Sequence, residues 1–258
     1  MKKLRAVLIA GAGGGIGYSI TRLLLKQGNI VIAIDNSEDR LDELKHKLSN
    51  WSNQLIVNCG DLSSEEFVKQ VISQQNSVFQ LDRIVYCVGV TGRGYIENTS
   101  LDDWNYIHCQ NLNSAFLLIK HSTPWLKLLE AASIVLTASI SANTAYAGGG
   151  CASYESSKAA LVQLSRSAAM ELAEWGVRVN CVSPGYVKTG FGDHRDILED
   201  SVYSSNHTKF RPKNIKEIPL KKGCLPDDVA ESIEFLLSNK SSYTTGTNLT
   251  MDGGYSVY

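Results

Sequence analysis

A glycine-rich turn joins the first apolar run of this chain to its first helix, and it constrains the fold more than any other feature. Residues 4–10 predict a buried strand, and a helix is predicted to follow as far as about Gln27. Between them lies Gly11-Ala12-Gly13-Gly14-Gly15-Ile16-Gly17. Glycines allow a tight turn and let a backbone approach a pyrophosphate at the start of a helix. Alone, the pattern also fits a turn of an α/β protein that binds no ligand.

The alternation of apolar strands and helices continues along the chain. Further strands are predicted at 30–35, 55–59, 83–88, 133–139, 177–183 and 249–251, and further helices at 37–51, 63–76, 101–129 (with a possible stop at Pro124), 153–175 and 226–237. Continuous apolar strands separated by helices indicate a parallel sheet covered on both faces. We therefore expect a doubly wound, Rossmann-type α/β fold of about seven strands.

The organisation along the chain indicates one domain over residues 1–258, because no linker or internal repeat divides it. The polar stretch at about 188–223 interrupts the alternation. Long loops inside compact domains are usually functional, so we expect this segment to cover the substrate. His194 and His207 lie in it and are interpreted as solvated residues rather than metal ligands, since no carboxylate or cysteine accompanies them at ligand spacing.

Composition excludes several classes of function. Apolar residues are 43% and charged residues 20% of the chain, which is typical of a globular protein. The formal charge of -1 gives no electrostatic case for a nucleic-acid or anionic-membrane partner, and no apolar run is long enough to cross a bilayer. The six cysteines are scattered without a CxxC pair, which indicates reduced core thiols of a cytoplasmic protein rather than disulfides or a metal site.

Two carboxylates follow predicted strands on the cofactor side of such a sheet. Asp35 ends the second strand, 18 residues after Gly17. A carboxylate there accepts hydrogen bonds from adenosine ribose hydroxyls and repels a 2′-phosphate, so NAD is favoured over NADP. Asp61 follows the third strand and is a candidate for the adenine edge. Each aspartate has an alternative interpretation as a cap of the helix that follows it.

Tyr154 and Lys158 lie one helical turn apart in Ser153-Tyr154-Glu155-Ser156-Ser157-Lys158. A tyrosine phenol has a pKa near 10, too high for efficient acid–base chemistry at neutral pH. The lysine ammonium and an oxidised nicotinamide both favour the phenolate, so we expect a lowered pKa. By itself the spacing is common on helix surfaces. Its position after Gly148-Gly149-Gly150 and before an apolar helix favours a catalytic interpretation.

Two polar residues complete a candidate site. Ser139 ends the fifth predicted strand, where ligands bind in open α/β sheets, and its hydroxyl is suited to orienting a substrate oxygen. Ser141 is a rival for that role, and a plain turn serine is the alternative. Asn111 lies inside the predicted helix 101–129, where asparagine is a poor helix former. We interpret it as marking a backbone irregularity that holds a relay water; the alternative is a solvent-facing polar residue.

Together these motifs resemble the short-chain dehydrogenase/reductase family over the whole chain. The family's TGxxxGxG loop matches Ala10 to Gly17, its helix asparagine Asn111, its strand serine Ser139, and its tyrosine and lysine Tyr154 and Lys158. Further matches are Arg178 to Gly185, Thr245-Gly246 and Asp252-Gly253-Gly254. Two positions depart from the pattern. Ala10 replaces a threonine, and Tyr86-Cys87-Val88-Gly89 replaces Asn-Asn-Ala-Gly while keeping its glycine.

The resemblance implies roles for individual residues. Tyr154 is expected to be the general acid or base, Ser139 to hold the substrate oxygen, Lys158 to bind the nicotinamide ribose, and Asn111 to position a relay water. The residues expected to bind NAD are Gly11, Gly15, Ile16, Gly17, Asp35, Asp61, Leu62, Gly89, Tyr154, Lys158, Pro184, Gly185, Val187 and Thr189. It also implies a homo-oligomer, a tetramer or dimer, formed through the helices at about 101–129 and 153–176.

The sequence therefore predicts an oxidoreductase that transfers a hydride between NAD(H) and a carbinol or carbonyl carbon of a small-molecule alcohol or ketone. Three alternatives remain: a non-catalytic dinucleotide sensor on the same fold, an NADP(H)-dependent ketoreductase, and an epimerase or dehydratase. Relatives of the last kind typically carry a larger C-terminal substrate domain.

Overall fold

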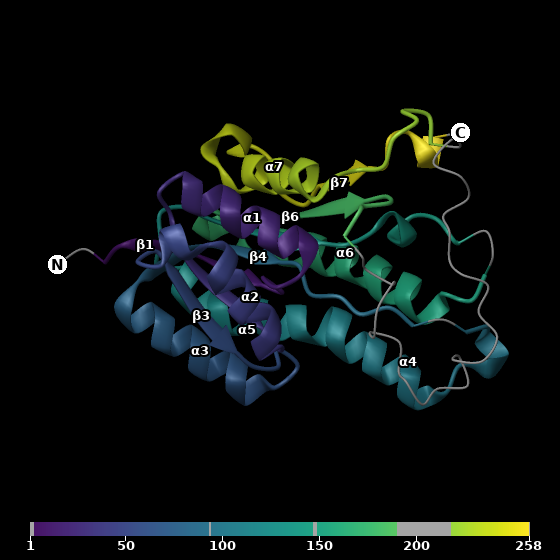
Figure 1. Ribbon diagram of the computed structural model, residues 1–258, viewed down its shortest axis with the longest axis horizontal. Coiled ribbons are helices and arrows are strands. Elements are labelled where there is room, and N and C mark those ends of the chain that lie inside the picture. Colours follow the sequence, from purple (N-terminus) through teal and green to yellow (C-terminus); the bar gives the residue numbers. More distant parts are fainter. Residues whose placement is uncertain (1–2, 93, 147–148, 190–217, 258) are drawn as a thin grey trace.

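Seven parallel strands form one sheet in the order β3-β2-β1-β4-β5-β6-β7 (Figure 1). The computed structural model describes residues 3–92, 94–146, 149–189 and 218–257. The strands are β1 Arg5–Ala10, β2 Ile30–Asp35, β3 Leu55–Cys59, β4 Gln80–Tyr86, β5 Ala132–Thr137, β6 Val177–Pro184 and β7 Asn248–Met251. The strand order reverses between β1 and β4, where a doubly wound fold binds its ligand. The predicted Rossmann-type class is confirmed.

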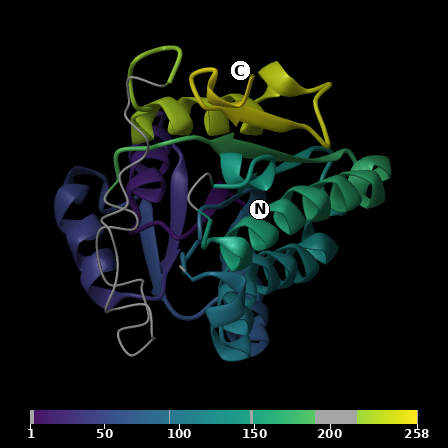
Figure 2. The same ribbon diagram turned by 90° about the vertical axis from the view of Figure 1, so that its right-hand side faces the viewer.

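Helices cover both faces of the sheet (Figures 1 and 2). They are α1 Gly15–Lys26, α2 Glu38–Lys47, α3 Glu65–Val78, α4 Leu101–His108, α5 Ser114–Leu126, α6 Ala152–Leu172 and α7 Pro226–Leu237. One apolar cluster joins the sheet to α1, α2 and α7, and the other joins it to α3, α5 and α6. Burial on both faces explains why the strands are continuous apolar runs, such as β5, in which all six residues are buried.

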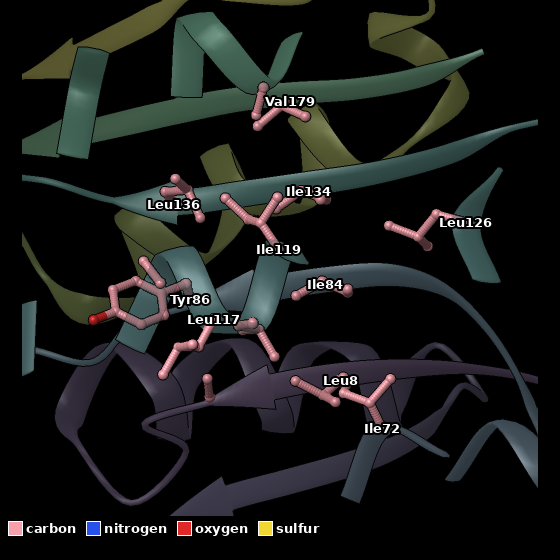
Figure 3. Packing of buried hydrophobic residues seen from close by; sticks show 14 of the residues in the cluster. Leu8, Ile72, Ile84, Tyr86, Leu117, Ile119, Leu126, Ile134, Leu136 and Val179 are labelled. Atoms are coloured by element: carbon pink, nitrogen blue, oxygen red, sulfur yellow. The ribbon is translucent and has the colours of Figure 1, made fainter. Parts of the chain in front are cut away.

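The cluster that joins the sheet to α3, α5 and α6 contains the central side chains of Figure 3. Leu8, Ile84, Ile134 and Val179 come from four adjacent strands, and they pack with side chains of α3 and α5. Tyr86 lies at one side of this group, with its phenol oxygen directed away from the aliphatic side chains (Figure 3). This packing fixes the carboxyl end of β4 relative to the helices that carry the candidate site.

Helix boundaries follow the local chemistry of the sequence in most places. Ser37 is the N-cap of α2, where its hydroxyl accepts the N–H of Arg40 at 3.3 Å. Pro226 begins α7, as predicted. The predicted stop at Pro124 is wrong, because α5 continues to Leu126. Pro124 removes one hydrogen bond to the carbonyl four residues back, but α5 continues for two more residues.

The long helix is interrupted elsewhere, by a π-helical turn at Cys109–Asn113 between α4 and α5. There the N–H of Ser114 bonds to the carbonyl of Cys109, five residues back. Turns of this kind are rare and often lie at functional sites. The backbone irregularity expected at Asn111 is therefore present.

Most of the segment expected to cover the substrate, residues 190–217 of 188–223, lies outside the described residues, and so do His194 and His207. Within the described part of the chain, no helix is both long and apolar enough to cross a membrane. All six cysteines are free thiols, but only Cys181 is buried and Cys59 is exposed. The prediction of core thiols therefore holds fully for Cys181, while Cys87 and Cys224 are partly buried and pack against the core.

Candidate active site

The turn between β1 and α1 presents the start of a helix at the carboxyl end of the sheet. Gly11 has φ +77°, and a Cβ there would lie 2.9 Å from the backbone of Cys87. A Cβ at Gly17 would lie 2.0 Å from the carbonyl oxygen of Gly11. No side chain caps α1, whose N-cap is Gly14. The first N–H groups of this helix are therefore suited to binding a pyrophosphate, and the glycines let its oxygens approach them.

Asp35 ties this glycine turn to the start of α2. Its Oδ2 accepts the N–H of Gly13 at 3.0 Å, and its Oδ1 accepts the N–H of Ser37 at 3.1 Å. The Nε of Arg40 lies 3.4 Å from Oδ1. Asp35 is 5% exposed and is not the N-cap of α2, which is Ser37. The carboxylate lies where the ribose of an adenosine reaches the end of β2 in this fold.

Asp61 and Leu62 follow β3 at the same edge of the sheet. The carboxylate of Asp61 accepts the N–H of Ser63 at 2.8 Å and its hydroxyl at 2.7 Å. The N-cap of α3 is Ser64, so the interpretation of Asp61 as that cap is wrong. Leu62 is 5% exposed, and its side chain packs in the core.

Ser139 and Tyr154 form the centre of the catalytic candidates. Ser139 lies two residues beyond the end of β5, rather than in the strand, and its Oγ accepts the N–H of Ser141 at 3.1 Å. Burial raises the pKa of Tyr154 to about 12, and the nearby hydroxyl of Ser139 opposes this rise. Ser139, rather than Ser141, is the serine that acts on the pKa of the phenol.

Lys158 follows Tyr154 by one turn of α6 and is 3% exposed. Its Nζ donates to the carbonyls of Thr137 at 3.1 Å and Val88 at 3.3 Å, and lies 5.9 Å from the centre of the Tyr154 ring. Burial lowers the pKa of Lys158 to about 8. In the cofactor-free protein, burial outweighs the other effects on the pKa of Tyr154, and the Lys158 ammonium donates to two carbonyl oxygens. The lowering expected from the lysine and an oxidised nicotinamide together stays a prediction.

Gly89 gives Lys158 the space for this position. A Cβ at Gly89 would lie 3.1 Å from Nζ of Lys158, so a larger residue would displace the ammonium. Gly89 is the one residue of Tyr86-Cys87-Val88-Gly89 that keeps the family pattern, and leaving room for the Lys158 ammonium is a structural reason for it.

Asn111 is fully buried, so its interpretation as a solvent-facing residue is wrong. Its Oδ1 accepts the N–H of Val90 at 2.7 Å, and its Nδ2 donates to the carbonyl of Val90 at 2.9 Å and to Ser157 Oγ at 3.0 Å. Ser157 donates in turn to the carbonyl of Tyr154 at 2.7 Å. The asparagine therefore connects the loop after β4 to the helix that carries Tyr154 and Lys158.

The sequence pattern does not predict the contacts of Tyr86 and Cys87, which replace the two asparagines of the family pattern. The phenol of Tyr86 reaches the π-helical turn. The thiol of Cys87 lies 3.4 Å from Thr137 Oγ1. Burial raises the pKa of Cys87 to about 11. A polar side chain at the end of a buried strand is the signal that was available for Tyr86.

The loop after β6 reaches the glycine turn from the opposite side. The N–H of Gly185 donates to the carbonyl of Met251 at 3.0 Å, and Val187 pairs with Cys224. A Cβ at Gly15 would lie 2.8 Å from Cβ of Thr189. Thr189 is therefore in contact range of the start of α1, as a residue that binds the same cofactor must be.

The structure thus brings the expected cofactor residues of β1, β2, β3, β4 and β6 to one edge of the sheet, with the four catalytic candidates beside them. Among the described residues, no three side chains of the metal-binding types gather to hold an ion.

The family model described as enoyl-(acyl carrier protein) reductase matches residues 11–256. Borneol dehydrogenase, mitochondrial, of Lavandula x intermedia is 34% identical over 256 residues, which are 98% of this chain and 91% of that protein. Zerumbone synthase of Zingiber zerumbet is 29% identical over 260 residues, 98% of this chain and 95% of that protein. A 3-oxoacyl-(acyl-carrier-protein) reductase of Staphylococcus epidermidis is 30% identical over 256 residues, 97% of this chain and 98% of that protein.

Solved structures match over the same length. ElxO with NADP bound has a TM-score of 0.86 and 27% identity and covers 100% of both chains, and ElxO has also been solved with NADPH. The ligand-free aldohexose dehydrogenase of Thermoplasma acidophilum has a TM-score of 0.81 and 25% identity over 100% of this chain and 95% of that one.

Proposed function

The chain belongs to the short-chain dehydrogenase/reductase family, and on this premise we propose that Tyr154, Ser139, Lys158 and Asn111 are its catalytic residues. The protein is a pyridine-nucleotide-dependent oxidoreductase of alcohols and ketones. The single observation that supports the catalytic assignment is the position of Lys158, which is buried one helical turn from Tyr154 with its Nζ 5.9 Å from the centre of the phenol ring.

The cofactor supplies or accepts the hydride at its nicotinamide ring. In the direction of reduction, Tyr154 donates its phenolic proton to the carbonyl oxygen. A pKa of about 12 keeps that proton on the phenol at neutral pH. In the direction of oxidation, a phenolate at Tyr154 takes the proton of the alcohol, and the positive charge of an oxidised nicotinamide would favour that phenolate.

Ser139 and Tyr154 together fix the substrate oxygen. The serine hydroxyl stabilises negative charge that develops on this oxygen, and its contact with the phenol holds the two groups on one oxygen atom. Lys158 holds the nicotinamide ribose. Its pKa of about 8 leaves most of the lysine charged at pH 7. Asn111 positions a relay water through the backbone of its π-helical turn.

We assign cofactor preference to Asp35 and propose NAD(H). The carboxylate lies at the end of β2 with 5% exposure, and no residue of the turn from Gly11 to Gly17 carries a positive charge that would bind a 2′-phosphate. The remaining parts of the cofactor are proposed to bind the residues expected from the sequence, among them Asp61 and Thr189.

NADP(H) is the second candidate, and two observations favour it. ElxO, which shares this fold over its whole length, binds NADP and NADPH. Arg40 lies beside Asp35 and is 44% exposed, so its guanidinium is placed to meet a phosphate if it leaves the carboxylate. Titration with NADH and, separately, NADPH distinguishes the two candidates: tighter binding of NADH supports the assignment to Asp35, and tighter binding of NADPH overturns it.

The activity itself is tested by supplying NAD⁺ with a panel of secondary alcohols, NADH with the matching ketones, and the NADP pair in parallel. Nicotinamide absorbance reports turnover. Turnover with any pair supports the proposal. Cofactor binding without turnover of any alcohol or ketone contradicts it and favours the non-catalytic sensor.

We further propose a cytoplasmic homo-oligomer, a tetramer or dimer. Phe116 of α5 is 49% exposed and Met170 of α6 is 82% exposed, which gives both long helices apolar side chains for a second copy. Free thiols at all six cysteines fit a reducing compartment. Light scattering tests the assembly, and a monomer mass contradicts it. Cell fractionation tests the compartment, and recovery from an oxidising compartment contradicts it.

A further inference from the structure

The phenol of Tyr86 lies where the family pattern has its first asparagine, and the side chain is completely buried. Its ring packs in the apolar cluster of β4, and its oxygen points out of that cluster (Figure 3). The oxygen lies 2.8 Å from the carbonyl of Gln110, 3.1 Å from the carbonyl of Asn111 and 2.6 Å from Ser114 Oγ. Among the described residues, every hydrogen-bond partner of the phenol therefore belongs to the π-helical turn or to the residue after it.

Two hydroxyl groups serve this widened turn. Ser114 Oγ donates to the carbonyl of Gln110 at 2.5 Å, which leaves the Tyr86 proton for the neighbouring acceptors. Burial raises the pKa of Tyr86, so the phenol stays protonated and remains a donor. A buried carbonyl that loses its donor is destabilised, so the phenol stabilises this form of the backbone.

The side chain of Asn111 extends from the same turn toward the candidate site. It bonds to both backbone groups of Val90 and to Ser157, which bonds to the carbonyl of Tyr154. A continuous series of hydrogen bonds therefore runs from Tyr86 through the turn and Asn111 to α6. Displacement of the turn would move Asn111 relative to Tyr154 and Lys158.

We propose that Tyr86 is a positioning residue for Asn111: its phenol holds the carbonyls of the π-helical turn and thereby the asparagine at the site. For its effect on catalysis, this assignment depends on the proposed function, in which Asn111 positions a relay water. Tyr86 itself touches no reacting atom. In this chain the tyrosine takes over, from the strand side, the local hydrogen bonding that the missing asparagines left open.

Tyr86→Phe is the test variant, because it removes one oxygen and keeps the ring in the core. The matched control is Ser133→Ala, which removes another buried hydroxyl whose bond to a backbone carbonyl, that of Leu236 at 3.0 Å, lies outside this network. The first readout is amide hydrogen exchange at Val90, whose N–H is held by Asn111 Oδ1 at 2.7 Å. The second readout is the separate measurement of kcat and KM, together with the pH dependence of kcat.

We expect Val90 exchange to rise about tenfold in Tyr86→Phe and to stay unchanged in Ser133→Ala. We also expect kcat to fall about tenfold with cofactor KM within about twofold, and the effect on kcat to vanish when Asn111 is already replaced by Ala. Unchanged exchange at Val90, or an equal change in Ser133→Ala, overturns the assignment. If the wild type is active and Tyr86→Phe leaves the exchange of Val90 unchanged, this inference alone is overturned. If the wild type is inactive and Tyr86→Phe raises the exchange of Val90, only the proposed function is overturned.

Discussion

The side chain of Asn111 binds both backbone polar groups of Val90, accepting its N–H at 2.7 Å and donating to its carbonyl at 2.9 Å. This pair of bonds joins the π-helical turn to the loop that leaves β4. Because the same side chain also bonds to Ser157 on α6, three segments meet at one buried amide. This amide therefore links the catalytic helix to the loop after β4, beside the bond from Lys158 to the carbonyl of Val88.

Replacing Asn111 by Leu is expected to lower the free energy of unfolding by about 3 kcal/mol, since three hydrogen bonds are lost and polar backbone groups of Val90 remain buried. Denaturant unfolding measures the change. Asn113→Leu is the matched control, because Asn113 lies in the same turn but is exposed. Its effect is expected to stay within about 0.5 kcal/mol. Equal losses in both variants would contradict the account.

Ser139→Ala is expected to reduce kcat about a hundredfold or more, because a hydroxyl that stabilises charge on the substrate oxygen is removed. Ser141→Ala serves as the control: Ser141 contributes its backbone N–H to Ser139 Oγ, and alanine keeps that N–H. Steady-state kinetics of both variants decide between the two serines. A larger loss of kcat in Ser141→Ala than in Ser139→Ala would show that Ser141, not Ser139, holds the substrate oxygen.

Asp35→Ser is expected to raise the ratio of NADPH to NADH affinity about tenfold or more, because the charge that repels a 2′-phosphate is removed and Arg40 loses its ion pair. Fluorescence titration with each cofactor gives the ratio. Asp39→Ser, an exposed position in the first turn of α2, removes an equal charge nearby and should leave the ratio unchanged. An unchanged ratio in Asp35→Ser would refute the assignment of NAD preference to this carboxylate.

Burial of Lys158 predicts a pH dependence of stability in the cofactor-free protein. Its pKa falls from 10.5 to about 8 on folding, so between these values the unfolded chain holds a proton that the folded protein has released. The contribution of Lys158 to the free energy of unfolding therefore rises with pH, by up to about 1.4 kcal/mol per pH unit. Cys87 and Cys181 above about pH 9, and Tyr154 above about pH 10, act in the opposite direction, because burial raises their pKa values.

Urea unfolding of the wild type and Lys158→Met between about pH 8 and pH 10 measures this contribution. The wild type should gain stability relative to the variant across that range. Lys120→Met, at an exposed position, is the control and should follow the wild type. Parallel curves for the wild type and Lys158→Met would show that the lysine titrates normally when folded.

Much of the fold was predictable because strand burial and helix starts are local properties of the sequence. β2, β3 and α7 have the predicted bounds, and Ser37 caps α2 as expected. The π-helical turn was predicted only as an irregularity near Asn111. Its form depends on partners from β4, a strand more than twenty residues away, which periodicity along the helix does not reveal.

The candidate site was predictable in identity but not in its energetics. Asn111, Ser139, Tyr154 and Lys158 are recognisable from type and spacing, and the structure brings them together. The pKa of Tyr154 was expected to be lowered, but burial raises it, and the degree of burial of a phenol is a property of the folded protein. The role of Tyr86 was missed for the same reason, because its partners lie on another element.

The activity of Tyr154→Phe tests the central claim most directly. The variant keeps the ring and loses only the phenolic oxygen that exchanges a proton with the substrate. We predict that kcat falls at least about a thousandfold while binding of the preferred nicotinamide cofactor remains within about threefold of the wild type. Turnover equal to that of the wild type, with cofactor binding intact, would contradict the assignment of Tyr154 as the general acid and base.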